Sequence, residues 1–176
     1  MNEAKACGFL ARAGWNVKNG YLYELETRRR SGVSDTVLVV SKEKLLEGRV
    51  CLEGILSGRP LRGIGEHIRI MASFCIPSPS EDSHAEVHIT GTYGGVQYMR
   101  ETKTRGTVMG FTLETEEGRI PVFCFGTTAE YLAKRAKEGD FLYIEGRIQS
   151  REYQNKRGQL KVSHEVAAWH IERTRQ

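Results

Sequence analysis

The chain has 176 residues, of which 39% are hydrophobic and 27% charged, with a formal net charge of +4. This composition is ordinary for a folded protein and excludes a disordered chain, and the length suits one medium domain or two small ones. The sequence contains neither an apolar run long enough to span a bilayer nor a signal-peptide core at its N-terminus, so we expect a cytoplasmic protein with no membrane partner.

The cysteine and histidine patterns argue against metal and catalytic chemistry. Cys7, Cys51, Cys75 and Cys124 are isolated and form no CxxC pair, so we expect buried free thiols in a reducing cytoplasm. The histidines have no metal-ligand spacing, and the glycine pairs do not precede a Lys-Ser or Lys-Thr as in a phosphate loop. We therefore expect no catalytic residue, no metal site and no cofactor.

Short strands separated by glycine-containing turns are predicted in the first half. Their ranges are 8–17, 21–28, 36–40, 49–57 and 67–76. A stretch rich in Pro, Ser and acidic residues follows and is typical of an interdomain linker. We place an N-terminal domain at residues 1–77, the linker at 78–84 and a C-terminal domain at 85–176.

The second half repeats this pattern and adds one helix. Strands are predicted at 86–93, 107–115, 119–125, 140–153 and 160–171. The helix is expected at 127–137, with Thr127 or Thr128 as its cap, Tyr131, Leu132 and Ala136 facing inward, and Gly139 at its end. Five strands with a helix between the third and fourth is the order of a five-stranded Greek-key barrel.

A sequence repeat relates the two halves. Residues 47–59 and 138–151 both contain Glu-Gly, an apolar strand, a second Glu-Gly, an alternating strand and an arginine. We therefore predict a duplicated domain. The expected fold is all-β with one short helix, built as two tandem five-stranded Greek-key barrels.

Side-chain alternation separates a core face from a candidate binding face in two strands of the second half. Leu142, Ile144 and Ile148 are predicted to face the core. The opposite face carries aromatic and cationic residues, namely Tyr143, Arg147, Arg151 and Tyr153 on one strand and Arg119, Phe123 and Phe125 on the other. Unpaired bases stack on aromatic rings and arginine meets the phosphates, so this face suits a single nucleic-acid strand. The alternative is that Phe123 and Phe125 fill a second small core beneath the helix and that the arginines form a solvated face.

Two basic hairpins accompany this face. One is predicted at residues 151–159 and carries Lys156 and Arg157, and the other carries Arg100, Lys103 and Arg105 beside Tyr98. Each could fold over a bound strand, or each could be an ordinary hairpin with solvated charges. The first half offers less, because Ile55 stands where the second half has Arg147. It has a basic hairpin tip at residues 28–30, and we infer that this half serves assembly as much as binding.

The second half resembles the bacterial single-stranded DNA-binding protein family. The resemblance is carried by Thr90-Gly91-Thr92-Tyr93-Gly94, by Val96-Gln97-Tyr98, by Phe111-Thr112-Leu113-Glu114-Thr115, by Ile120-Pro121-Val122-Phe123-Cys124-Phe125-Gly126, by the stretch from Gly139 to Tyr153, and by Ser163-His164-Glu165-Val166. The first half is similar to the N-terminal barrel of two-barrel family members from some Gram-positive bacteria. The resemblance implies OB-fold barrels, base stacking by Phe125 and Tyr153, and phosphate contacts by Arg147 and Arg151.

The chain departs from the family pattern at several points. Glu116, Glu117 and Arg119 occupy a region where the family usually has further tryptophans. The last residues are basic, so recruitment of enzymes through an acidic C-terminal tail is not expected. Trp15 and Trp169 lie in apolar strand contexts, and we predict that both are packing residues.

The leading functional prediction is sequence-nonspecific binding of single-stranded DNA in replication, recombination or repair, without enzymatic activity. RNA remains open as a ligand, because nothing in the sequence would distinguish a 2′-hydroxyl. Single-barrel family members assemble as tetramers, so by analogy a two-barrel chain is expected to form a homodimer. The alternative is a structural or protein-interaction accessory, of the primosome or mobile-element type, with weak nucleic-acid binding.

Overall fold

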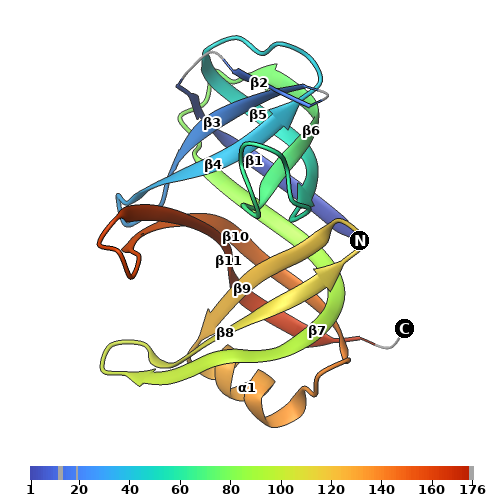
Figure 1. Ribbon diagram of the computed structural model, residues 1–176, viewed down its shortest axis with the longest axis vertical. Helices are drawn as coiled ribbons and strands as arrows, with labels where there is room; N and C mark the ends of the chain where they lie inside the picture. Colours follow the sequence, from blue (N-terminus) through green and yellow to red (C-terminus); the bar gives the residue numbers. More distant parts are fainter. Residues whose placement is uncertain (12–13, 19, 175–176) are drawn as a thin grey trace.

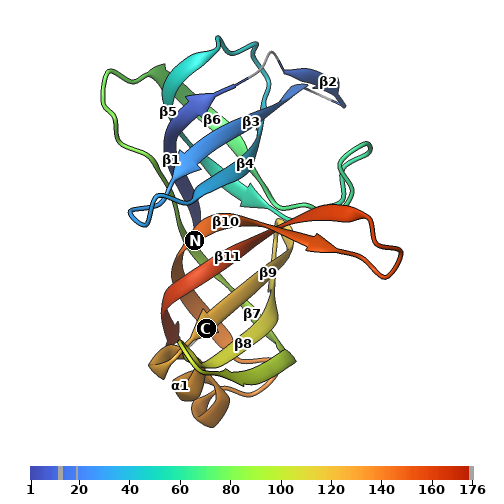
Figure 2. The same ribbon diagram turned by 90° about the vertical axis from the view of Figure 1, so that its left-hand side faces the viewer.

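The computed structural model describes residues 1–11, 14–18 and 20–174. Within them the chain forms eleven strands and one helix, which confirms the all-β class with one short helix. None of the described helical segments is long and apolar enough to cross a membrane. Two groups of strands lie one above the other along the long axis of the molecule (Figures 1 and 2).

The first group, called here the first ring, comes from the N-terminal half. Its strands are β1 (Asn2–Leu10), β3 (Gly20–Arg28), β4 (Ser34–Ser41), β5 (Gly48–Ser57) and β6 (Arg69–Pro77), with the short β2 (Trp15–Val17) attached to β3. The pairings run β1–β5–β6–β4–β3 and return to β1, so the strands close on themselves.

The first strand begins earlier than the sequence pattern predicts. A single strand was expected at 8–17, whereas β1 covers Asn2–Leu10 and β2 is separate; residues 12 and 13 of that prediction lie outside the described residues. The core side of β1 is formed by Ala4, Ala6 and Leu10, all at most 1% exposed. Two of these three are alanines, which gave too weak an apolar alternation to mark the strand.

The second ring is built from β7 (His84–Thr102), β8 (Gly106–Thr115), β9 (Gly118–Phe125), β10 (Phe141–Gln154) and β11 (Leu160–Arg173). Its pairings run β7–β10–β11–β9–β8 and return to β7. This is the order of the first ring, strand for strand. Both rings also contain one parallel pair, β4 with β6 and β9 with β11.

The Glu-Gly repeat found in the sequence has the same structural meaning in both rings. A register shift lies between Glu53 and Gly54 in the β5–β6 pair and between Glu145 and Gly146 in the β10–β11 pair. A side chain at either glycine would collide with a neighbouring backbone carbonyl, that of Met71 or of Ala167. Each glycine therefore allows the close strand approach at a bulge that bends its ring.

Strand β7 is longer than predicted because it continues through a glycine pair. Gly94-Gly95 was expected to end the strand near residue 93, but β7 runs to Thr102. Register shifts occur between Tyr93 and Val96 and again between Val96 and Tyr98, and Gly95 adopts a φ of 83°. The glycines thus form bulges within the strand rather than a turn.

Helix α1 (Thr127–Arg135) lies at the end of the second ring remote from the first (Figure 1). The predicted threonine cap is wrong, because Gly126 is the N-cap and no side chain caps the helix. Ala129 and Leu132 are buried and Ala136 packs partly against the core, but Tyr131 is 44% exposed. The inward position predicted for Tyr131 is therefore wrong, since only the side of this 9-residue helix that carries Ala129 and Leu132 faces the ring.

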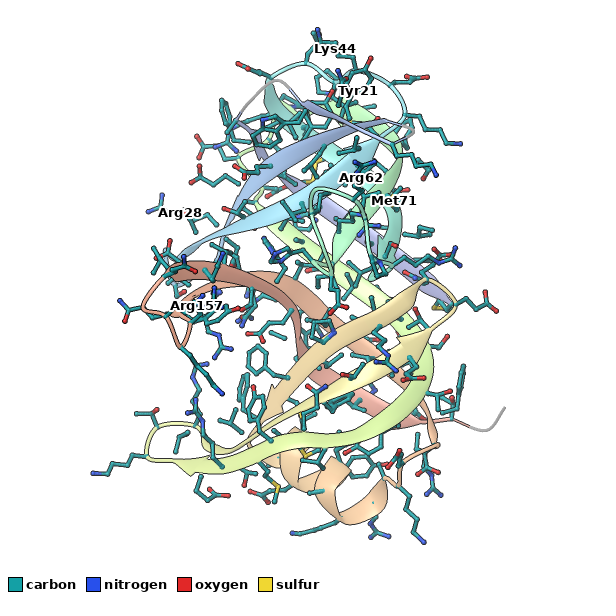
Figure 3. The ribbon with its side chains drawn as sticks, in the orientation of Figure 1. Tyr21, Arg28, Lys44, Arg62, Met71 and Arg157 are labelled. Atoms are coloured by element: carbon teal, nitrogen blue, oxygen red, sulfur yellow. A yellow bond between two sulfur atoms is a disulfide. The ribbon has the colours of Figure 1, made fainter. Side chains whose placement is uncertain are left out.

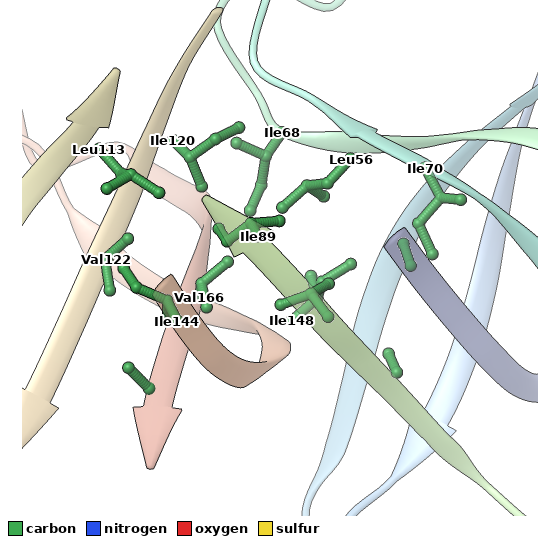
Figure 4. Packing of buried hydrophobic residues seen from close by; sticks show 14 of the residues in the cluster. Leu56, Ile68, Ile70, Ile89, Leu113, Ile120, Val122, Ile144, Ile148 and Val166 are labelled. Atoms are coloured by element: carbon green, nitrogen blue, oxygen red, sulfur yellow. The ribbon is translucent and has the colours of Figure 1, made fainter. Parts of the chain in front are cut away.

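The two rings share one continuous hydrophobic core. Strand β1 pairs with β7 from Asn2↔Ile89 to Cys7↔His84. Leu56 and Ile68 of the first ring belong to the same buried cluster as Ile89 and Ile120 of the second (Figure 4). Residues 78–83 connect β6 to β7 outside any strand, so the chain crosses between two halves that are already held together by a sheet and a core.

The structure corrects the expectation for two of the cysteines. Cys7 and Cys51 are direct cross-strand partners in the β1–β5 pair and form a disulfide. Cys75 and Cys124 are free, and burial raises the pKa of the Cys124 thiol to about 12. Cross-strand adjacency depends on register, and sequence spacing does not reveal it.

Candidate nucleic-acid interface

Phe125 ends strand β9 with its ring partly open to solvent. Ile120, Val122 and Cys124 point into the core, at 0–2% exposure, so the alternation places Arg119, Phe123 and Phe125 outward as predicted. Phe125 is 38% exposed. Gly126, with a φ of 59°, turns the chain into α1 immediately afterwards, and this leaves the aromatic side chain of Phe125 uncovered.

Phe123 lies on the same face but is only 7% exposed. It forms a small cluster with Val108 of β8 and Ala167 of β11, whereas the buried helix residues Ala129 and Leu132 belong to the main core. The second small core anticipated as an alternative therefore exists for Phe123, on the sheet rather than beneath the helix. The centroid of the Phe123 side chain lies 6.3 Å from that of Phe125, so Phe123 supports the Phe125 side chain from one side.

Tyr98 joins this group through the β7 bulges, and the sequence analysis did not single it out as a contact residue. Its ring lies over Gly110 of β8, which is itself the cross-strand partner of Phe123. Burial raises the pKa of the Tyr98 hydroxyl, while Arg151 and Arg100 lie near enough to act in the opposite direction. The only signal in the sequence was an aromatic residue shortly after a glycine pair, and its place opposite Gly110 depends on the register of β7 and β8.

Most of the predicted basic residues lie on two hairpins that project to the same side of the second ring (Figure 1). The β7–β8 hairpin carries Arg100, Lys103 and Arg105, all exposed. The guanidinium carbon of Arg105 lies 5.6 Å from the centroid of the Phe125 ring, in cation–π geometry. The hydroxyl of Thr102 accepts a hydrogen bond from the backbone N–H of Arg105 at 3.1 Å and shapes this turn.

The β10–β11 hairpin extends beyond its ring as an arm (Figure 2). Tyr153 is 45% exposed on it, and Arg157 lies at its free end (Figure 3). The Asn155 carboxamide oxygen accepts hydrogen bonds from the N–H groups of Arg157 and Gln159, at 2.9 and 3.0 Å, which orders the turn that bears Lys156. Arg151 faces Glu165 at 3.8 Å at the base of the arm.

Three other predicted site residues, Tyr143 and Arg147 on β10 and Arg119 on β9, are engaged within the fold or lie at a strand end. Tyr143 donates a hydrogen bond to Glu145 at 2.8 Å, which raises the pKa of the tyrosine, and His88 contacts its hydroxyl at 2.9 Å. Arg147 is half-buried, and burial lowers its pKa; its partner Ala167 pairs in turn with Phe123, so Arg147 lies on the same side as Phe123. Arg119 is exposed at the far end of β9 and faces Glu114 at 3.4 Å.

The base of the arm is fixed by the first ring. Asp35 of β4, only 2% exposed, accepts a hydrogen bond from the backbone N–H of Ser150 at 2.8 Å. The Ser150 hydroxyl in turn accepts one from the N–H of Thr36 at 2.9 Å. Arg29 holds both oxygens of Asp35 at 2.6 Å. One arginine of the predicted basic tip at 28–30 is therefore engaged within the fold.

A histidine pair lies at the same junction. Nδ1 of His164 on β11 is 3.1 Å from Nδ1 of His67, which precedes β6. Burial, followed by the proximity of His67, lowers the pKa of His164 from 6.5 to about 4. The low pKa keeps His164 neutral near pH 7, and its contact with His67 packs the two rings together, consistent with the structural role expected for the histidines.

The tryptophans do not pack as predicted. Trp15 is 44% exposed on β2 and Trp169 is 45% exposed on β11. Trp15 belongs to a short strand at the edge of the first ring, and Trp169 lies on the outward side of a closed ring. Trp169 is moreover the extra residue at the register shift of the β10–β11 pair, since Glu145 pairs with His170 and Gly146 with Ala168.

Comparisons with known proteins identify relatives of this chain. The model of the single-strand binding protein family matches residues 84–174. The wild-type single-stranded DNA binding protein from Thermus aquaticus has a similar structure, with a TM-score of 0.72 and 21% sequence identity over 100% of this chain and 94% of that one. A deletion variant of the same protein gives a TM-score of 0.71 at 21% identity, over 100% and 95% of the two chains. At this identity the likeness shows the fold alone. A search of curated proteins finds no match.

Proposed function

Because the chain belongs to the single-strand binding protein family, we propose that it binds single-stranded DNA without sequence specificity. The observation that carries the proposal is the partly exposed Phe125 ring beside the basic β7–β8 hairpin, whose Arg105 lies over it. The proposal places the protein in the cytoplasm, where single strands arise in replication, recombination or repair. The family is not an enzymatic one, and no reaction is assigned.

Aromatic rings supply the contacts to the bases. Phe125, Tyr153 and Tyr98 are each 38–45% exposed, so each ring has an open side for stacking. A stacked base contributes about 1–3 kcal/mol, and every base has such a surface, so these contacts do not select a sequence. Phe123 has too little exposed surface to stack on a base, and its proposed role is to hold Phe125 in place.

Basic side chains supply the contacts to the phosphates. The candidates on the two hairpins and their bases are Arg100, Lys103, Arg105, Arg151, Lys156 and Arg157. Neutralising phosphates releases counterions, so the affinity should fall as the salt concentration rises. The contacts assigned to Tyr143, Arg147 and Arg119 stay predictions, and the first two have surroundings less suited to a nucleic acid than the hairpins are.

We also infer that each ring is an OB-type Greek-key barrel, so that residues 1–77 and 85–176 are two domains joined at 78–84. The identical strand order and the equivalent Glu-Gly bulges support this division.

A homodimer would bring four such barrels together. Exposed Phe9, Phe74 and Ile76 on β1 and β6 offer apolar surface for that assembly. Light scattering should give twice the mass of one chain, and a monomer mass would contradict it.

The decisive test of DNA binding is fluorescence anisotropy of a labelled oligo-dT at two salt concentrations. The wild type should bind tightly and weaken with salt. The Phe125→Ala/Tyr153→Ala variant should bind about 30-fold more weakly or worse, because two stacking surfaces are lost. Tyr131→Ala removes a comparably exposed ring on α1 and should bind like the wild type.

No binding by the wild type at low salt would overturn the proposal. It would favour the structural or protein-interaction role, which the glutamates at positions 116 and 117 already support, because they stand where stacking residues would be expected.

A further inference from the structure

A pocket of about 590 Å³ lies at the junction of the rings, beyond the aromatic residues already described. One wall comes from the loop between β5 and β6, through Gly58, Arg59, Pro60 and Glu66. The other comes from the second ring, through Gln97, Thr112, Gly118, Arg119 and Pro121. The volume is within the range typical of small-ligand sites. Arg62 marks the same loop in Figure 3.

The loop is held against the second ring by backbone contacts. The N–H of Gly58 donates to the carbonyl of Glu117 at 2.9 Å, and Gly58 forms a bridge with Gly118. The Arg59 guanidinium donates to the carbonyl of Glu116 at 2.6 Å. A side chain at Gly58 would overlap the carbonyl of Arg119. The two walls are therefore formed before any ligand arrives, which lowers the entropic cost of binding.

The pocket continues the face that carries Phe125. Arg119 and Pro121 alternate with core residues on β9, so they point to the same side as Phe123 and Phe125. Pro121 precedes Phe125 by four residues, a separation of about 13 Å along a strand. A DNA strand that stacks on Phe125 and runs along β9 toward the first ring would reach this pocket next.

The lining suits a nucleobase better than a phosphate. Its arginines already face carboxylates, Arg59 with Glu117 at 3.6 Å and Arg119 with Glu114 at 3.4 Å. Between them lie the Gln97 carboxamide and the Thr112 hydroxyl, which are hydrogen-bonded to each other and provide both donors and acceptors. Pro60 and Pro121 add apolar surface on the two walls.

The β7 bulges account for the position of Gln97. Val96 pairs with Phe111 and Tyr98 pairs with Gly110, so Gln97 is the extra residue between them. A bulge of this kind turns a side chain out of the regular alternation. The same irregularity that places Tyr98 over Gly110 thus places Gln97 beside Thr112, on the outer side of β8.

We infer that this junction pocket binds a nucleobase of the DNA strand, and that the first ring takes part in binding through Pro60 and its loop. The inference rests on the proposed function and extends it from the second ring to the contact between the rings. It assigns the 58–68 loop a ligand role that sequence analysis did not foresee.

The test uses Gln97→Ala/Thr112→Ala in the full chain. The variant carries the charge of the wild type, so its phosphate contacts and its salt dependence should not change. Its affinity for labelled oligo-dT should fall about ten-fold, the loss of one well-held base. On a strand of the same length made only of abasic sites, the variant and the wild type should bind equally at low salt.

Pro60→Ala tests the wall that the first ring provides, with Pro79→Ala as its matched control in the 78–83 connection. Pro60→Ala should weaken oligo-dT binding several-fold and Pro79→Ala should not. Thr92→Ala, on β7 and outside the lining of this pocket, is the corresponding control for Thr112. Thermal melts of all variants should coincide, because each substituted side chain is at least partly exposed.

The outcomes separate this inference from the proposed function. Failure of the wild type to bind oligo-dT overturns both. Wild-type binding that depends on Phe125 and Tyr153 but is unchanged in Gln97→Ala/Thr112→Ala overturns the pocket alone. So does a loss that persists equally on the abasic strand, or a normal affinity of Pro60→Ala.

Discussion

Phe123 and Phe125 occupy equivalent positions in the alternation of β9, yet one is 7% and the other 38% exposed. The difference arises from their neighbours. Phe123 lies mid-strand between Gly110 of β8 and Ala167 of β11, whose small size leaves room for its ring. Phe125 lies at the strand end, where the chain turns away into α1. Alternation assigns a face, but the neighbouring strands decide how much of that face is open.

His164 leads to a prediction about stability. Its folded pKa of about 4 is below the unfolded value of 6.5, so the unfolded chain takes up the proton more readily. The contribution to stability is therefore complete above about pH 6.5 and is lost as the pH falls toward 4. Between pH 7 and pH 5 the unfolding free energy should fall by about 2 kcal/mol from this residue.

Urea denaturation at a series of pH values measures this effect. His164→Gln keeps a polar side chain that does not titrate, so its stability should change much less over the same interval. Equal pH dependence in the variant and the wild type would show that His164 is not the source.

At the level of elements, glycines formed bulges within strands, including a place where the local sequence pattern predicts a turn. Gly94-Gly95 became bulges that carry β7 past its expected end, whereas Gly54 and Gly146 became the bulges shared by the two rings. A glycine pair favours a turn when considered alone. Inside a ring it permits a bulge instead, because closure requires strong bending and the partner strand supplies the remaining hydrogen bonds.

The β1–β5 pair carries a prediction about redox state. The Cys7–Cys51 disulfide closes a loop with a sequence separation of 44 and fixes a strand that also pairs with β7. A disulfide of this kind stabilises a protein by about 2–4 kcal/mol, so a reducing agent should lower the thermal midpoint.

Differential scanning calorimetry with and without dithiothreitol tests this prediction. Cys7→Ser/Cys51→Ser should melt at the lower temperature in both conditions, and Cys75→Ser should remain as sensitive as the wild type. An effect of reductant on the double variant would contradict the assignment.

At the scale of the molecule, the two rings are joined by a strand pair, a common core and the close contact of the 58–68 loop with the β8–β9 turn. The base of the β10–β11 arm is also fixed by Asp35 of the first ring. The first ring therefore contributes to the geometry of the binding face even where it supplies none of the stacking residues. The assembly role expected of the first ring stays a prediction, and the junction pocket would give this ring a direct role in binding.

Gly58→Ala tests the loop contact. The added methyl group would overlap the carbonyl oxygen of Arg119, so the loop must move and the unfolding free energy should fall by about 1–3 kcal/mol. Gly63→Ala, in the same loop, meets no atom within 4 Å and bears only the strain of a φ of 93°, about 1 kcal/mol. Chemical denaturation should rank the two variants in this order, and a larger loss in Gly63→Ala would contradict it.

The sequence by itself determined the all-β class, the core faces of β9 and β10, the basic hairpins and the resemblance of the second half to a known family. These features depend on local alternation and short motifs, which survive without knowledge of neighbours. Only the tertiary structure decided the disulfide, the burial of Phe123, the position of Tyr98 and the pocket between the rings. Each of these depends on register or on contacts between residues far apart in the chain, and a one-residue change of register would abolish them.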